Sequence, residues 1–140
     1  MKILLAVDGS EYSKKAAAFL VTHERLAGPE DELVVLHVQS AVPPRVKTML
    51  GASAIRAYHE EEAAKVLGPL ERFLKRHKLN FRTMWVVGSP ALEVVRVAKQ
   101  QKAHMIVMGT HGHGVLGRAL MGSVAQKVVS DCDIPVLLVK

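Results

Sequence analysis

A glycine-rich segment is the part of this sequence best suited to chemistry. It covers residues 109–123 and holds five glycines between an apolar run and a typical helix start. Glycine lets backbone N–H groups come close to an oxyanion, and the first amides of a helix carry a partial positive charge. The segment therefore predicts a phosphate-binding loop. It is not a P-loop, because no Gly-Lys-Ser/Thr ends it, and not a dinucleotide fingerprint, because it does not follow the first strand.

Five short apolar runs must position that loop. Each is a continuous stretch bounded by glycine, proline or polar residues, which is the pattern of a strand buried on both faces. The predicted strands are residues 3–7, 33–38, 81–87, 105–108 and 136–139. Helical patterns separate them. This alternation predicts a single α/β domain over residues 1–140, with a doubly wound, five-stranded parallel sheet of order 3-2-1-4-5 and helices on both faces.

Signals at helix ends delimit the first helices. Ser10 is expected to cap a helix that ends before Gly28. Residues 39–50 contain two adjacent prolines and are predicted to form a loop. Residues 53–77 carry apolar side chains at helical spacing, but Pro69 lies inside them. Because proline lacks an N–H and its ring crowds the preceding turn, this long helix is expected to bend or split there.

Two further helices have clear starting signals. Ser89 is expected to cap a helix that begins at Pro90 and continues to about Lys102. After the glycine-rich segment, Ser123 is followed three residues later by Gln126, which is the pattern of a capping box. The last predicted helix therefore begins with Ser123 as its N-cap.

The predicted strand order brings three distant residues to one crevice. In a doubly wound sheet, ligands bind outside the carboxyl ends of the strands, where the strand order reverses. Asp8, Val38 and Gly109 follow or end the strands that flank this point. An acid at the position of Asp8 can also serve only to stabilise the following helix through its dipole. Its place at the reversal point favours contact with a ligand.

The composition narrows the class of ligand and partner. The net charge is +6, which favours anionic ligands, whereas an aromatic content of 4% leaves little material for stacking on bases. A nucleic-acid partner is therefore not expected. The single cysteine, Cys132, cannot form an intrachain disulfide, and neither a signal peptide nor a membrane span is evident. These features predict a cytoplasmic protein without a membrane partner.

Three histidines lie within a short span and could suggest a metal site. They are His104, His111 and His113. No cysteine or carboxylate accompanies them, so surface or phosphate-facing histidines are the favoured interpretation. No metal held by protein side chains is expected.

The spacing of the glycines is specific: Gly109-x2-Gly112-x9-Gly122-Ser123. With this motif the sequence resembles the universal stress protein family over its full length. The other stretches that carry the resemblance are the opening strand with Asp8 and Ser10, and residues 36–38, 106–112 and 134–139.

The resemblance implies a binding site for ATP, ADP or AMP, with Mg²⁺ bound through the phosphates. Asp8 and Val38 would flank the adenosine, and the backbone of Val38 would face the adenine edge. The ribose and phosphates would be held by Gly109, Gly112, Gly122 and Ser123. The other implied site residues are Ala6, Met108, His113, Arg118 and Val124. His113 stands where the family commonly has a basic residue, so the charge facing the phosphates would depend more on Arg118.

The resemblance also implies a homodimer, because family members usually pair through their last strand. Here that strand is Val136–Val139, an apolar edge with no helix after it, which pairing would cover. The expected function is that of a cytoplasmic, ATP-binding, stress-response regulatory protein, a dimeric switch with an unknown protein partner.

Hydrolysis of ATP is expected to be slow at most. No catalytic residue is assigned, because no glutamine, acid or His–acid pair is placed to orient a water molecule against a γ-phosphate. Two alternatives remain open. One is a Mg-dependent ATPase or phosphotransfer enzyme that uses Asp8, and the other is a nucleotide-free dimeric interaction module.

Overall fold

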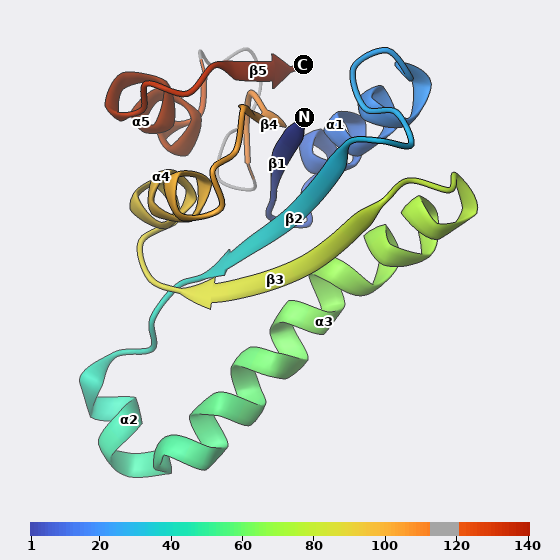
Figure 1. Cartoon of the computed structure of the whole chain (residues 1–140). Coiled ribbons are helices and arrows are strands. Elements are labelled where there is room, and N and C mark those ends of the chain that lie inside the picture. Colours follow the sequence, from blue (N-terminus) through green and yellow to red (C-terminus); the bar gives the residue numbers. More distant parts are fainter. Residues whose placement is uncertain (113–120) are drawn as a thin grey trace.

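The computed structural model describes residues 1–112 and 121–140, which form a five-stranded sheet between two layers of helices (Figure 1). The strands are β1 (Lys2–Val7), β2 (Glu32–Gln39), β3 (Phe81–Val87), β4 (Met105–Gly109) and β5 (Val136–Val139). The helices are α1 (Glu11–Thr22), α2 (Pro44–Leu50), α3 (Ala52–Arg76), α4 (Pro90–Gln100) and α5 (Ser123–Asp131). The strand order is β3-β2-β1-β4-β5 and all neighbours are parallel. The predicted single α/β domain of order 3-2-1-4-5 is confirmed.

Each face of the sheet has its own hydrophobic core. Ile3, Leu5 and Val7 of β1 pack with α1 and α3 on one face, whereas Leu4 and Ala6 pack with α4 and α5 on the other. All five are buried. Since both faces are covered, the strand is a continuous apolar run rather than an alternating one. The carboxyl ends of β1, β2 and β4 meet at one edge, where the strand order reverses.

Residues 39–50 are not the loop that the two prolines suggested, because α2 occupies most of this segment. Pro44 stands in the first turn of α2, where a helix needs no amide donor. No residue of α2 is buried. A helix without a buried face has no apolar periodicity, so the sequence pattern could not distinguish it from a loop.

The long helix was predicted to bend or split at Pro69, and the split is wrong, because Pro69 lies inside α3, which is one helix of 25 residues. A proline crowds the Cβ atom of the residue before it, but here that residue is Gly68, which has no Cβ. Leu67, Leu70 and Leu74 are buried on both sides of the interruption. Their packing against the sheet holds the two halves in one helix.

The starts of two helices are confirmed, whereas their ends come earlier than predicted. Ser10 caps α1 by accepting a hydrogen bond from the Ser13 amide, and Ser89 stands at the N-cap of α4. The helix α1 ends at Thr22, and α4 ends at Gln100. Among the described residues, no helix is both long and apolar enough to cross a membrane.

Candidate functional site

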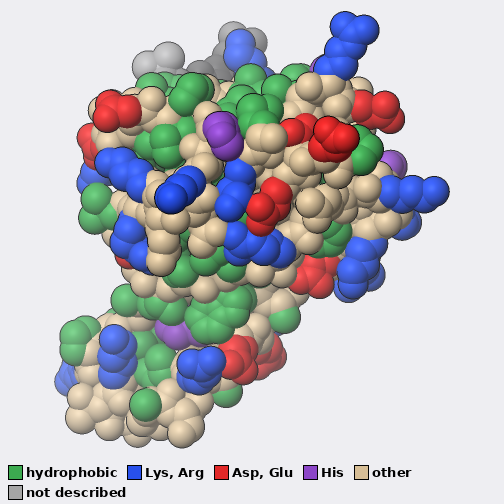
Figure 2. Space-filling view, in the orientation of Figure 1, with side chains coloured by type: hydrophobic (Ala, Val, Ile, Leu, Met, Phe, Trp, Pro, Cys, Tyr) green, Lys and Arg blue, Asp and Glu red, His purple; other side chains and the backbone are tan. Residues whose placement is uncertain are grey.

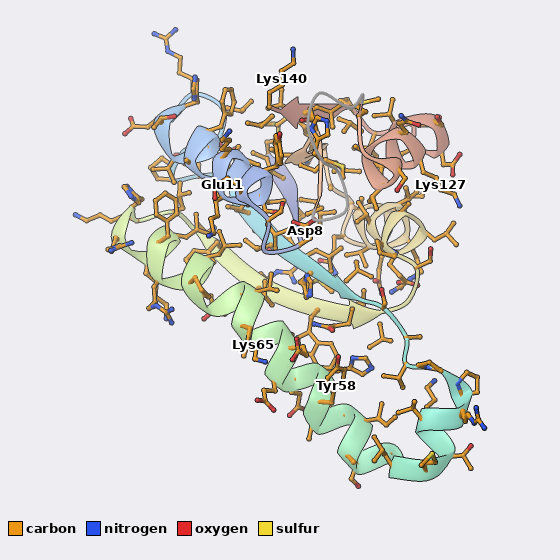
Figure 3. The ribbon with its side chains drawn as sticks, turned by 180° about the vertical axis from the view of Figure 1, so that it is seen from behind. Asp8, Glu11, Tyr58, Lys65, Lys127 and Lys140 are labelled. Atoms are coloured by element: carbon orange, nitrogen blue, oxygen red, sulfur yellow. The ribbon has the colours of Figure 1, made fainter. Side chains whose placement is uncertain are left out.

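A cavity of about 290 Å³ opens at the carboxyl ends of β1, β2 and β4, where the strand order reverses. Figure 3 labels Asp8 at this edge, where β1 leads into α1. The described residues that the sequence assigned to the site all line the cavity: Ala6, Asp8, Val38, Met108, Gly109, Gly112, Gly122, Ser123 and Val124. The two cationic candidates, His113 and Arg118, lie outside the described residues.

The carboxylate of Asp8 is fixed by the start of α1. Its Oδ1 accepts hydrogen bonds from the Ser10 amide at 2.9 Å and from the Ser13 hydroxyl at 2.8 Å. The Ser13 hydroxyl in turn accepts a bond from the Asp8 amide at 2.9 Å. Gly9, with φ of 81°, allows the tight turn that brings these groups together. The carboxylate is therefore held in place before any ligand arrives.

We expect Ser13→Ala to lower the free energy of unfolding by about 1–3 kcal/mol. The buried Ser13 hydroxyl forms hydrogen bonds with both the amide and the carboxylate of Asp8. Alanine has no hydroxyl, so both hydrogen bonds are lost. Urea unfolding followed by the fluorescence of Trp85, the only tryptophan, measures the change. The matched control is Ser89→Ala, because the exposed Ser89 makes no side-chain capping bond and should cost less than about 0.5 kcal/mol. Equal losses in the two variants would contradict this role of Ser13.

The floor of the cavity is apolar and comes from the sheet and from α4. Leu36 and Val38 lie at the end of β2, Met108 lies near the end of β4, and Pro90 and Val94 belong to α4. Such a surface suits a flat, weakly polar ring better than a charged group. The polar and glycine residues lie toward Asp8 and the start of α5, so the cavity has an apolar end and a polar end.

Two glycines are required by close contacts beside the cavity. A Cβ atom at Gly109 would lie 2.5 Å from the Tyr12 Cβ and 2.9 Å from the Tyr12 carbonyl carbon. A Cβ atom at Gly112 would lie 2.6 Å from Oδ2 of Asp8. Gly109 thus lets β4 pack closely against α1. Gly112 lets the backbone lie next to the carboxylate.

The helix α5 begins differently from the predicted capping box. Its N-cap is Gly122 rather than Ser123, and it has no side-chain capping bond. The Gln126 side chain donates to the carbonyl of Met121 at 2.9 Å instead of closing a box with Ser123. The Gly122 amide donates a hydrogen bond to the backbone carbonyl of Thr110 at 2.7 Å, which connects the start of α5 to the end of β4. The Ser123 side chain, freed from capping, lines the cavity beside the first amides of α5.

Several lining residues were not predicted from the sequence. Ser13 reaches the cavity from α1, and Thr110 and His111 follow β4. The Thr110 hydroxyl lies 2.8 Å from Nδ1 of His111, and the imidazole lies 4.8 Å from the Tyr12 ring. The spacing of Ser13, three residues after the N-cap, was the one signal that could have identified it.

The structure gives no support to a histidine metal site within residues 1–112 and 121–140. No three histidine, cysteine or acidic residues in these ranges are grouped to hold a metal ion. His104 precedes β4 and accepts a hydrogen bond from the Lys2 amide, whereas His111 follows that strand. The two imidazoles therefore lie at opposite ends of β4.

Comparison with known proteins gives consistent matches over the whole chain. The profile of the universal stress protein family matches residues 1–140. The universal stress protein encoded 3′ of the QAH/OAS sulfhydrylase of Thermus aquaticus is 35% identical over 138 residues, which cover 99% of this chain and 97% of the relative. The solved structure of protein MJ0577 of Methanocaldococcus jannaschii is 29% identical, covers 99% of this chain and 94% of its own, and superposes with a TM-score of 0.83.

Two similar structures hold nucleotides. The universal stress protein of Archaeoglobus fulgidus in complex with dAMP is 24% identical, with a TM-score of 0.69, and the match covers 100% of this chain and 98% of its own. A universal stress protein in complex with cAMP is 20% identical, with a TM-score of 0.66, and covers 100% and 96%. At these identities the likeness establishes a shared fold. The profile match over the full length and the 35% identical Thermus relative show that this chain belongs to the universal stress protein family.

Proposed function

We propose that this protein binds an adenine nucleotide, ATP foremost, and acts in the cytoplasm as a stress-response regulator. The observation that carries the proposal is a single cavity that joins an apolar floor to a glycine-lined helix start at the reversal point of the sheet. The relatives in complex with dAMP and cAMP support an adenine nucleotide as the ligand. The nucleotide state would change the surface that the protein offers to a protein partner.

The two ends of the cavity suit the two ends of a nucleotide. The adenine would lie on the apolar floor, with its edge toward the backbone of Val38. The phosphates would lie at Gly112, Gly122 and the first amides of α5, where close approach and the helix dipole favour an anion. The oriented carboxylate of Asp8 would accept hydrogen bonds from ribose hydroxyls. Mg²⁺ would enter with the phosphates, which supply its oxygen ligands.

The cavity offers binding groups rather than a catalytic set. Asp8 and His111 are the titratable residues among the described part of its lining. The bonds from Ser10 and Ser13 hold Oδ1 of the Asp8 carboxylate at the start of α1, where we propose that the ribose lies. We therefore assign a binding role to the site, with slow hydrolysis at most.

The proposal is tested by mass spectrometry of small molecules released by heat from gently purified protein, followed by titration of ATP into stripped protein. An adenine nucleotide in the released fraction and saturable binding of ATP are the expected results. Neither a released nucleotide nor binding of ATP, ADP or AMP would instead favour the nucleotide-free interaction module. Rapid turnover of ATP with Mg²⁺ would favour the ATPase.

A homodimer through β5 is a second part of the proposal. The strand pairs with β4 on one side only, which leaves its other edge open within the described chain. Ile106 donates to the Pro135 carbonyl and Thr110 donates to the Val139 carbonyl. Since backbone groups alternate along a strand, those of Val136 and Leu138 point to the open edge. A second β5 could pair there without disturbing the sheet.

We expect Val136→Pro to weaken the dimer by at least about tenfold. Proline removes an N–H that points to the open edge, and the first residue of a strand tolerates it, so the bonds between β4 and β5 remain. Analytical ultracentrifugation measures the dissociation constant, and thermal unfolding checks the fold. A wild-type protein that sediments as a monomer at micromolar concentration would contradict the dimer.

A further inference from the structure

A helical arm projects from the body of the molecule. It consists of α2 and the first half of α3, which extend past the end of β3 at the lower left of Figure 1. No residue from Ala41 to Ala54 is buried. The first buried side chains of α3 are those of Ile55 and His59, and the His59 ring lies 6.2 Å from that of Trp85. The outer part of the arm therefore adds no side chain to the hydrophobic cores.

Large apolar side chains gather on this outer part. Met49 is 80% exposed, Leu50 58% and Tyr58 50%. Met49 and Leu50 end α2 at the turn made by Gly51, and Figure 3 labels Tyr58 on the adjoining part of α3. Single exposed apolar residues are normal on protein surfaces, but here three lie on one projection.

The charge of the same region has one sign. Residues 33–59 contain no aspartate or glutamate, whereas Arg45, Lys47 and Arg56 lie on the outer part of the arm. Among the described residues, Arg45 and Lys47 have no ion pair. Figure 2 shows these basic and hydrophobic side chains together on the projection, with acidic side chains where it joins the body.

The acidic side chains on the arm begin further along α3. They are Glu60, Glu61 and Glu62. At 1.5 Å per residue they lie about 15 Å along the helix from Gly51, which exceeds the screening length of about 8 Å at physiological salt. Glu60 is paired with Arg56 at 3.1 Å and Glu62 with Lys65 at 2.9 Å, and the Glu62 hydrogen bond raises the pKa of Lys65. The three acids therefore lie outside the acid-free stretch that holds Arg45 and Lys47.

We propose that the end of this arm docks on an anionic lipid bilayer, with Met49 and Leu50 entering the interface and Arg45 and Lys47 facing the lipid phosphates. The tip is convex and carries cations but no acids, so it is attracted to the negative surface of such a bilayer. The apolar side chains can enter the bilayer interface, and this contact needs no complementary groove. A second copy of the chain fits less well. A second copy would have to supply acidic groups for the cations of the arm, and two of the arm's three acids are already paired.

This peripheral contact departs from the expectation of no membrane partner, which was based on the lack of a membrane-spanning segment in the sequence. The sequence pattern did not indicate it, because residues 39–50 were predicted to form a loop. The helix α2 places Met49 and Leu50 within two turns of the unpaired cations Arg45 and Lys47. The inference is independent of nucleotide binding, since no residue of the outer arm lines the cavity.

Co-sedimentation of the full chain with vesicles tests the inference. Vesicles of phosphatidylcholine with phosphatidylglycerol are expected to bind the protein, and vesicles of phosphatidylcholine alone are not. Two double variants, Met49→Ser with Leu50→Ser and Arg45→Glu with Lys47→Glu, are each expected to weaken binding by at least about tenfold. The fold should tolerate both, because α2 has no buried residue.

Controls place single substitutions of the same kinds on α4. They are Leu92→Ser, at a side chain that is 56% exposed, and Lys99→Glu, at an exposed cation. Neither should change vesicle binding. Absence of binding to anionic vesicles, equal binding to neutral ones, or an equal loss in the controls would overturn the proposal. If the arm variants instead lower the sedimentation coefficient without vesicles, the arm is a contact between copies of the chain and the lipid proposal fails.

Discussion

Gly112→Val is expected to weaken ATP binding by at least about a hundredfold while the chain stays folded. A Cβ atom at this position would lie 2.6 Å from Oδ2 of Asp8, so either the carboxylate or the backbone must move. The two methyl groups of valine would also occupy space where the phosphates are proposed to lie. Gly112 is only half-buried, so the hydrophobic cores are not affected. Calorimetric titration of ATP into the folded variant measures the loss.

The matched control for this variant is Gly88→Val. Gly88 follows β3 outside the cavity, and the three atoms nearest to a Cβ atom there would all belong to the Glu93 side chain, which can rotate away. The affinity of the Gly88→Val variant for ATP should equal that of the wild-type protein. Wild-type affinity in Gly112→Val would show that this glycine does not face the ligand, and the proposed position of the phosphates would be wrong.

Gly109→Ala is expected to lower the free energy of unfolding by about 3 kcal/mol, at the upper end of what overpacking costs. The added methyl group would meet the backbone and Cβ of Tyr12 at 2.5–3.0 Å, and a backbone cannot rotate away as a side chain can. The helix α1 must therefore move from β4. Because α1 also carries Ser13, which holds Asp8, nucleotide binding should weaken as well.

Gly88→Ala separates backbone crowding from the mere addition of a methyl group. Its Cβ atom would also come within 3 Å of a neighbour, but that neighbour is the Glu93 side chain. We expect Gly88→Ala to lower the free energy of unfolding by less than half as much as Gly109→Ala does. Urea unfolding followed by Trp85 fluorescence compares the two variants, and equal losses would contradict the close packing of β4 on α1.

The sheet and the position of the cavity could be predicted because their signals are local. Buried parallel strands leave continuous apolar runs, and the alternation with helices restricts the topology to few choices. The strand order then fixes which strand ends meet. Asp8, Val38 and Gly109, which are far apart in the sequence, were assigned to one crevice on this ground, and they line one cavity.

The two errors in helix prediction have different physical causes. Pro44–Leu50 forms a helix whose exposed side chains give no periodic signal. Pro69 stays inside α3 because Gly68 has no Cβ for the proline ring to crowd and buried leucines hold both flanking turns. The first error reflects a missing sequence signal, and the second reflects packing that the pattern of single residues does not contain.

The start of α5 shows the same limit at the site itself. The spacing of Ser123 and Gln126 matches a capping box, but the Gln126 side chain bonds the Met121 carbonyl instead. The direction in which the chain enters the helix decides between these partners, and the sequence does not specify it. The role of Ser13 was missed similarly, since it depends on the turn at Gly9.

The central claim is that the cavity at the ends of β1, β2 and β4 binds an adenine nucleotide. Amide chemical shifts of isotope-labelled protein, recorded during a titration with ATP, test it most directly. Our account predicts saturable shifts concentrated at Asp8, Val38, Gly112 and Ser123, with little change at Gly51 on the arm. Absence of saturable shifts, or shifts confined to residues outside the cavity, would contradict it.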